Sequence, residues 1–205
     1  MPRPRINTLA DIETAVWQEL TRAPRDKHHE WRTPVLATVQ AGEAGPQADA
    51  RTVVLREVDR ETRSLLLFTD ARSPKVAQMA AHPQGTVVMW SKNLGWQLRI
   101  GVQLRVETEG LAVLSRWARL KLSPAAQDYM APSPPGSELP AEMTAAAQDS
   151  PPASAAFANP QGPRESREHF AVIAASVQSI DWLELSGQGH RRAAFSAGTS
   201  RWLVP

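Results

Sequence analysis

The chain has 205 residues and no cysteine, which excludes disulfides, zinc–thiolate sites and thiol nucleophiles. Its 42% apolar and 21% charged residues are typical of a globular protein that holds its core without covalent staples. The net charge of +2 and the lack of an apolar run of roughly 18 residues argue against nucleic-acid and membrane partners, and we expect a small anionic ligand instead.

The N-terminal part of the chain predicts a helix. Thr8 followed by Asp11 resembles a capping box, and apolar residues then recur at helical spacing. We expect an amphipathic helix over residues 8–22, ended by Pro24. The preceding segment Met1–Asn7 is basic and leads into no apolar run, which argues against a secretory signal. Together with the missing cysteines, this favours the cytoplasm.

Residues 34 to 107 consist mainly of β-rich runs with short connections. One helix is expected to begin at Ser73-Pro74 and to end at His82-Pro83. The short connections favour antiparallel hairpins. Strands are predicted over residues 34–39, 50–58, 64–69, 85–91 and 96–107.

The remaining chain contains a long excursion rich in proline and alanine, over about residues 123–165. A helix is expected before it, around residues 111–120, and another within it, near 141–149. A loop of this length inside a compact domain is usually functional or disordered. Strands then return over residues 170–177, 180–185, 192–195 and 202–204.

The order of these elements predicts the fold class. Strands do not alternate regularly with helices, which argues against a doubly wound parallel sheet. A small barrel closes its own edges and suits short antiparallel strands. We therefore expect one mainly β (α+β) domain over residues 1–205, an antiparallel barrel with flanking helices.

The residues most indicative of chemistry lie between Arg51 and Gln97. Arg51 and Arg56 bracket an apolar run, and strand alternation places them on opposite faces of one expected strand. Lys75 falls in the first turn of the helix that begins at Ser73-Pro74, where the helix dipole favours an anion and opposes a lysine. A bound phosphate removes that conflict. An ordinary helix start with a solvated lysine is the alternative.

Several short motifs, in this order, resemble the pyridoxamine 5′-phosphate oxidase family. The family patterns R-x-V-L-L-K, Y-T-N, S-R-K, N-P and R-Q-V-R are similar to Arg51–Arg56, Phe68–Asp70, Ser73–Lys75, His82-Pro83 and Trp96–Arg99. The C-terminal strands and Trp202 are similar as well. The resemblance covers residues 30–107 and 169–205 and implies a split β-barrel.

The resemblance also implies FMN as cofactor and a homodimer with FMN at the subunit interface. Arg51, Ser73 and Lys75 match the positions that hold the FMN phosphate. Gln97 matches a glutamine that reaches FMN from the second subunit, and Leu183 stands where the family often has tryptophan. The other matched flavin contacts are Thr52, Val53, Val54, Phe68, Thr69 and Arg192.

The substrate side is matched less well. His190 and Arg192 take the catalytic positions near the flavin ring, and Arg56, Lys121 and His190 take the substrate-binding positions. Arg56 replaces a lysine, and the family's arginine-x-histidine motif keeps only its histidine because Gln188 replaces the arginine. Trp117 stands at the position that aligns with a tyrosine of the family. These departures indicate a divergent member of the family.

The resemblance implies an FMN-dependent oxidoreductase, in which a substrate carbon gives hydride to flavin N5 and oxygen reoxidises the flavin with release of hydrogen peroxide. The changes around Gln188 also favour an FMN carrier or sensor without turnover, and a flavin reductase remains a further alternative. The sequence does not identify the substrate. The adjacent pair His28-His29 has no carboxylate at ligand spacing, so no metal site is expected.

Overall fold

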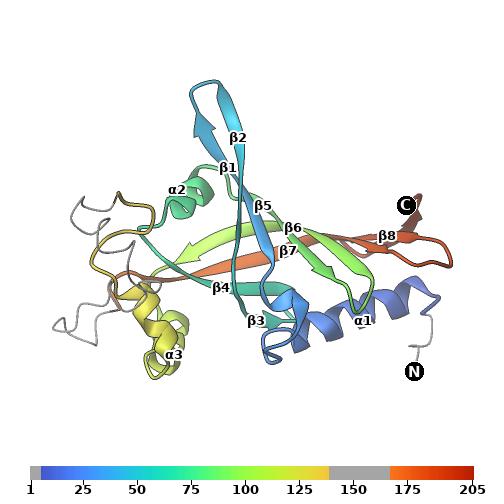
Figure 1. Cartoon of the computed structure of the whole chain (residues 1–205), viewed down its shortest axis with the longest axis horizontal. Coiled ribbons are helices and arrows are strands. Elements are labelled where there is room, and N and C mark those ends of the chain that lie inside the picture. The colour runs from blue at the N-terminus through green and yellow to red at the C-terminus, as the bar shows by residue number, and fades with distance from the viewer. Residues whose placement is uncertain (1–5, 139–166) are drawn as a thin grey trace, which may run out of the picture. The chain divides into compact units, whose positions relative to one another are not determined.

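The structure is a computed structural model that describes residues 6–138 and 167–205 (Figure 1). The chain divides into two compact units, and α2 (Pro74–Ala81) contributes residues to both. The expected helix at residues 141–149 lies outside the described residues. No helix within the described part of the chain is long and apolar enough to cross a membrane. The first unit comprises residues 1–67, 78–105 and 174–205, and the second comprises 68–77 and 106–173.

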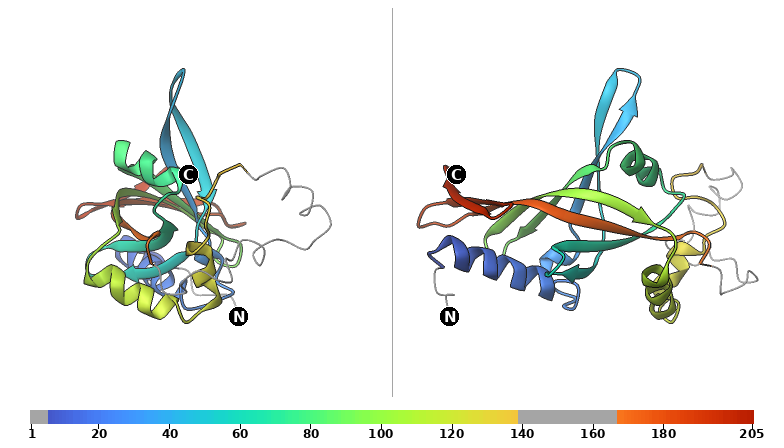
Figure 2. Two further views of the ribbon diagram at one scale, coloured as in Figure 1. Left: turned by 90° about the vertical axis from the view of Figure 1, so that its left-hand side faces the viewer. Right: turned by 180° about the vertical axis from the view of Figure 1, so that it is seen from behind.

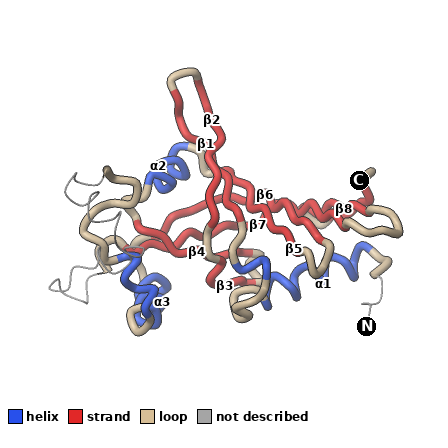
Figure 3. The backbone as a smooth tube through the Cα atoms, in the orientation of Figure 1, coloured by secondary structure: helices blue, strands red, loops and turns tan. Residues whose placement is uncertain are grey.

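Strands make up much of the described chain, as the tube drawing shows (Figure 3). Along one sheet they run in the order β2-β1-β5-β6-β7-β4-β3, and β8 and β9 extend it from β7. The pairs β1/β2, β1/β5, β3/β4, β5/β6, β7/β8 and β8/β9 are antiparallel, which confirms the predicted class. The strands are β1 (Val35–Gly42), β2 (Gly45–Thr52), β3 (Leu55–Asp59), β4 (Ser64–Asp70), β5 (Gln84–Ser91), β6 (Trp96–Glu107), β7 (Phe170–Glu184), β8 (Arg191–Ser196) and β9 (Thr199–Leu203).

The strand prediction for residues 50–58 is wrong. The chain leaves the sheet at Val53-Val54, where the Val53 N–H donates to Pro34 O at 2.9 Å. Arg51 therefore lies on β2 and Arg56 on β3, at a register shift between Leu55 and Glu57. Because the two arginines lie on different strands, the prediction that they occupy opposite faces of one strand is wrong.

The strand that begins at Phe170 is longer than the sequence indicates. The two runs expected at 170–177 and 180–185 form one strand of 15 residues, β7, which is orange in Figure 2. The polar pair Gln178-Ser179 does not break it, because Gln178 is exposed and Ser179 pairs with Ser196 of β8.

In the core of the first unit, α1 (Leu9–Arg22) packs against the sheet. Thr8 caps this helix as predicted, since the Asp11 N–H donates to its hydroxyl at 3.1 Å. Trp31 lies in the 3₁₀ helix η1 (Glu30–Arg32), and its ring is 6.4 Å from that of Trp96, which is 5.5 Å from that of Trp182. Trp96 is thus a core residue. The helix buries Ile12, Val16, Trp17 and Leu20.

The adjacent histidines His28 and His29 of the first unit differ in burial. His29 is buried, its Nε2 lies 3.0 Å from a carboxylate oxygen of Glu19, and its Nδ1 accepts from the Trp31 N–H at 3.1 Å. Because Nδ1 is an acceptor there, the neutral ring carries its proton on Nε2 and donates it to Glu19. His28 is exposed.

The second unit has its own aromatic core. Phe170 packs against Phe68, Trp117 and Tyr129, with ring centroids 5.1, 5.3 and 5.4 Å apart. Trp117 comes from α3 (Leu111–Leu120), and Tyr129 comes from the 3₁₀ helix η2 (Pro124–Tyr129). The start of the proline-rich excursion therefore contributes a core residue.

Candidate functional site

Lys75 lies in the second unit with two buried hydroxyls. Its ammonium donates to Ser73 Oγ at 2.5 Å and to Thr69 Oγ1 at 3.2 Å. Thr69 lies near the end of β4 and Ser73 directly precedes α2, so a tight strand–turn–helix connection gathers the three groups. A cation and two hydroxyls at a helix N-terminus are a donor set suited to phosphate.

The turn between Thr69 and Ser73 is fixed by an ion pair. Arg72 donates from Nε to one Asp70 carboxylate oxygen at 3.1 Å and from Nη2 to the other at 2.7 Å. Hydrogen bonding to Asp70 raises the pKa of Arg72. The same guanidinium donates to Ala131 O at 2.7 Å and to Pro132 O at 3.0 Å. Arg72 thus joins the turn to the beginning of the excursion.

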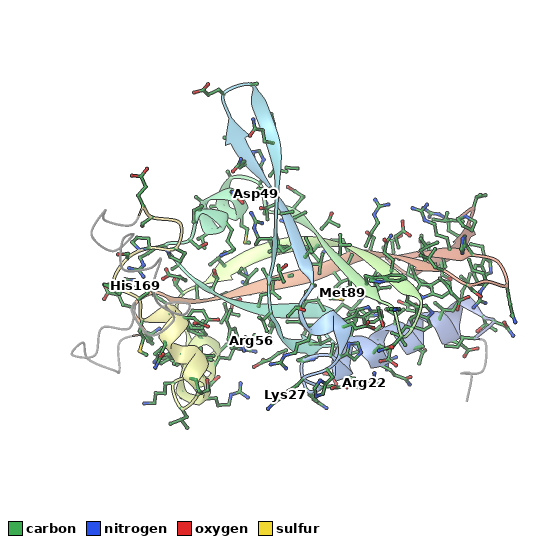
Figure 4. The ribbon with its side chains drawn as sticks, viewed as in Figure 1. Arg22, Lys27, Asp49, Arg56, Met89 and His169 are labelled. Atoms are coloured by element: carbon green, nitrogen blue, oxygen red, sulfur yellow. The ribbon has the colours of Figure 1, made fainter. Side chains whose placement is uncertain are left out.

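Arg51 lies in the first unit within a polar network. Its Nη1 donates to Leu36 O at 3.2 Å and to Thr38 Oγ1 at 2.6 Å. Its Nη2 donates to Gln78 Oε1 at 2.9 Å and to the Asp49 carboxylate. Asp49 is labelled on β2 in Figure 4. The guanidinium is therefore held in place by β1, β2 and α2.

Asp49 is ionised within this network. Gln78 Nε2 donates to its Oδ2 at 2.8 Å, and this bond, with the charge of Arg51, lowers the pKa of Asp49. A carboxyl whose pKa is lowered in the folded state adds stability above its ordinary pKa, and that stability is lost as pH falls through the lowered value. Asp49 is therefore negatively charged at neutral pH.

Gln97, Leu183 and Arg192 share one face of the sheet in the first unit. Leu183 and Arg192 are register partners, and Arg192 donates to both carboxylate oxygens of Asp181, at 3.0 and 2.7 Å. Arg99, two residues after Gln97, lies 3.8 Å from the same carboxylate. The bonds to Asp181 raise the pKa of Arg192. These three predicted flavin contacts thus lie on a common, half-exposed surface.

The other matched flavin residues of the first unit lie around the break between β2 and β3. Thr52 is the exposed last residue of β2, and Val53 and Val54 form the half-buried break itself. Arg56 is half-buried on β3 (Figure 4). Phe68 belongs to the second unit and packs edge-on against Phe170.

Two of the residues predicted to bind the substrate, His190 and Lys121, are exposed. His190 is exposed, and its Nδ1 accepts from the Ser186 N–H at 3.3 Å. Gln188 is exposed in the same turn. In the second unit, Lys121 is exposed at the end of α3, whereas Trp117 is buried. Trp117 therefore acts as a core residue and has no hydroxyl to offer a substrate.

Asp49, Thr38 and Gln78 were not predicted as neighbours of Arg51. The spacing of two between Asp49 and Arg51 on a strand was an available signal, because such residues share a face. Gln78 carried no signal, since it reaches Arg51 from a helix 27 residues away. Among residues 6–138 and 167–205, no three histidine or acidic side chains are placed to hold a metal ion.

Comparison with known proteins relates this arrangement to a family. Residues 14–108 match the family model described as "Pyridoxamine 5'-phosphate oxidase, FMN-binding domain". The resemblance to this family is confirmed. A curated pyridoxine/pyridoxamine 5′-phosphate oxidase from Thermosynechococcus vestitus is 42% identical over 81 residues, which are 40% of this chain. The match spans 36% of that relative's length.

Solved structures show the same fold. A pyridoxamine 5′-phosphate oxidase-related, FMN-binding protein from Nostoc punctiforme superposes with a TM-score of 0.71 and 24% identity, over 97% of this chain and 100% of that one. PhzG from Burkholderia lata, in complex with tetrahydrophenazine-1-carboxylic acid, has a TM-score of 0.67 and 16% identity, over 97% and 94% of the two chains. The split β-barrel architecture predicted from the sequence is therefore confirmed. Lys121, Leu183, His190 and Arg192 lie outside the segment that matches the family model.

Proposed function

We propose that the protein is an FMN-binding flavoprotein that acts as an oxidoreductase on a small anionic substrate. The observation that carries the proposal is the Lys75 cluster with Ser73 and Thr69, which lies inside the segment similar to FMN-binding domains. A doubly charged phosphate suits this donor set, because each charge-assisted hydrogen bond contributes about 1.5–3 kcal/mol. FMN, when bound, supplies a two-electron acceptor.

The protein's own residues would bind and orient the cofactor. In the second unit, Lys75 and Ser73 would hold its phosphate. In the first unit, Arg51 matches a position that holds the phosphate in the family. The backbone at Val53 and Val54 lies outside the strands and, together with Thr52, would contact the flavin. In the second unit, Phe68 and Thr69 match positions that line the flavin ring. His190 and Arg192 would lie near the reacting end, and Arg56 and Lys121 would attract an anionic substrate.

The experiment is a calorimetric titration of the purified chain with FMN. We expect saturable binding at close to one FMN per chain. A folded protein that is colourless as purified and gives no heat with excess FMN would exclude this function.

The protein is further proposed to be a homodimer, supported by the surface that carries Gln97, Leu183 and Arg192. Trp90 is the register partner of Gln97 and is 45% exposed, so a large aromatic side chain adjoins this surface. Such residues are enriched at protein interfaces. Sedimentation velocity should give a dimer, and Trp90→Glu should shift it toward monomer. A stable wild-type monomer that still binds FMN tightly would refute this assembly.

An FMN carrier or sensor without turnover is the second candidate function. The burial of Trp117 favours it, because the position aligned with a substrate-binding tyrosine belongs to the aromatic core around Phe170. A flavin reductase has no specific observation in its favour. Anaerobic photoreduction followed by reoxidation with candidate acceptors separates these activities.

A further inference from the structure

We propose that Asp49 is an internal competitor of the cofactor phosphate at Arg51, so that it weakens and tunes FMN binding. This inference rests on the proposed function and assigns to Asp49 a role that the resemblance does not imply. It is based on the hydrogen bonds that other groups of the chain accept from the Arg51 guanidinium.

Arg51 has few donors left for a ligand. A guanidinium has five N–H donors, two on each Nη and one on Nε. Leu36 O and Thr38 Oγ1 accept from Nη1, while Gln78 Oε1 and Asp49 Oδ2 accept from Nη2. Of these five donors, only the Nε–H has no hydrogen-bond acceptor among the described residues. A phosphate that takes two bonds from Arg51 must therefore displace one of these four acceptors.

Asp49 is the acceptor that is easiest to displace. Thr38 and Gln78 are buried, at 3% and 8% exposure, and Leu36 O belongs to the backbone of β1. The Asp49 side chain is 37% exposed, and that of Arg51 is 20% exposed. A pair this accessible to water contributes little stability, so breaking it costs little. Asp49 is also the only one of the four that is an anion, and it would repel a phosphate at the same guanidinium.

Gln78 keeps the competitor in position. Its Oε1 accepts from Arg51 while its Nε2 donates to Asp49, so one amide orients both charges. Because these contacts lower the pKa of Asp49, the carboxylate stays ionised through the neutral range. Acid would protonate Asp49 and remove its charge only at a pH below the ordinary pKa of a carboxyl group. A substitution therefore tests the idea better than a change of pH.

The test compares wild-type protein with Asp49→Asn by titration with FMN and with riboflavin, which lacks the phosphate. We expect Asp49→Asn to bind FMN about fivefold more tightly, the upper range for an exposed ion pair. Riboflavin affinity should not change. In an Arg51→Gln background the gain should disappear. Asp59→Asn is the matched control, because Asp59 is an exposed carboxylate bonded to the Thr62 and Glu61 N–H groups in a turn. Thermal melting checks that each variant folds.

The outcomes separate this inference from the function it rests on. Equal or weaker FMN binding by folded Asp49→Asn would overturn it and would indicate that Asp49 only positions Arg51. A gain that persists with Arg51→Gln, or that also appears with riboflavin, would overturn it as well. If neither the wild type nor Asp49→Asn binds FMN, the proposed function itself fails. Wild-type binding without a gain removes only the competitor role.

Discussion

Replacing Lys75 with methionine is expected to weaken FMN binding by about one to two decades. Methionine keeps much of the length of the side chain and removes the charge that donates to Ser73 and Thr69. Losing one charge-assisted hydrogen bond to phosphate costs about 1.5–3 kcal/mol, and each 1.4 kcal/mol is a factor of about ten in affinity. Calorimetric titration with FMN measures the change.

The control for this variant is Lys92→Met, the same substitution at an exposed lysine in the turn between β5 and β6. It should leave FMN affinity unchanged. Riboflavin affinity should be the same in all three proteins, because the lost contact involves the phosphate alone. Unaltered FMN affinity in folded Lys75→Met protein would show that the phosphate binds elsewhere.

Pyridoxamine 5′-phosphate is expected to be a poor substrate or none. Catalysis of its oxidation depends on clamping the substrate phosphate, so that the reacting carbon is held against the flavin. Here Trp117 is buried at the position of the clamping tyrosine, and Gln188 replaces an arginine in an exposed turn. Loss of even one charged contact lowers binding by about one to two decades. Release of hydrogen peroxide at steady state measures the turnover.

We expect kcat/KM below about 10⁴ M⁻¹s⁻¹, the low end of ordinary enzymes. A higher value with intact FMN binding would show that the substrate pocket is built from other residues. The follow-up variant, Gln188→Arg, restores the motif beside His190. If it gives no gain in phosphate-dependent binding, the pocket has diverged beyond this position.

Much of the fold could be predicted from local patterns. The helix capped by Thr8 and the hairpin strands around Lys92 follow from signals within a few residues of each other. The break at Val53-Val54 could not be predicted, because both residues are β-branched and favour a continuous strand. A long-range bond from Val53 to Pro34 determines where β2 ends. Tertiary context overrides propensity there.

The candidate site was predictable only in part. Lys75 and Ser73 are close in the sequence and belong to one turn, so their contact follows from helix-start geometry. The network around Arg51 depends on Gln78, which comes from a different element, and no sequence spacing relates the two. Likewise, nothing local indicates that Trp117 packs on Phe170 instead of facing a ligand.

The most direct test of the central claim is a paired calorimetric titration of the wild-type protein with FMN and with riboflavin under the same conditions. If the protein is an FMN-binding flavoprotein that recognises the phosphate through Lys75 and its neighbours, FMN should bind at close to one per chain. It should also bind at least about one to two decades more tightly than riboflavin, the value of one charged phosphate contact. Equal affinity for the two flavins, or no binding of FMN, would contradict the account.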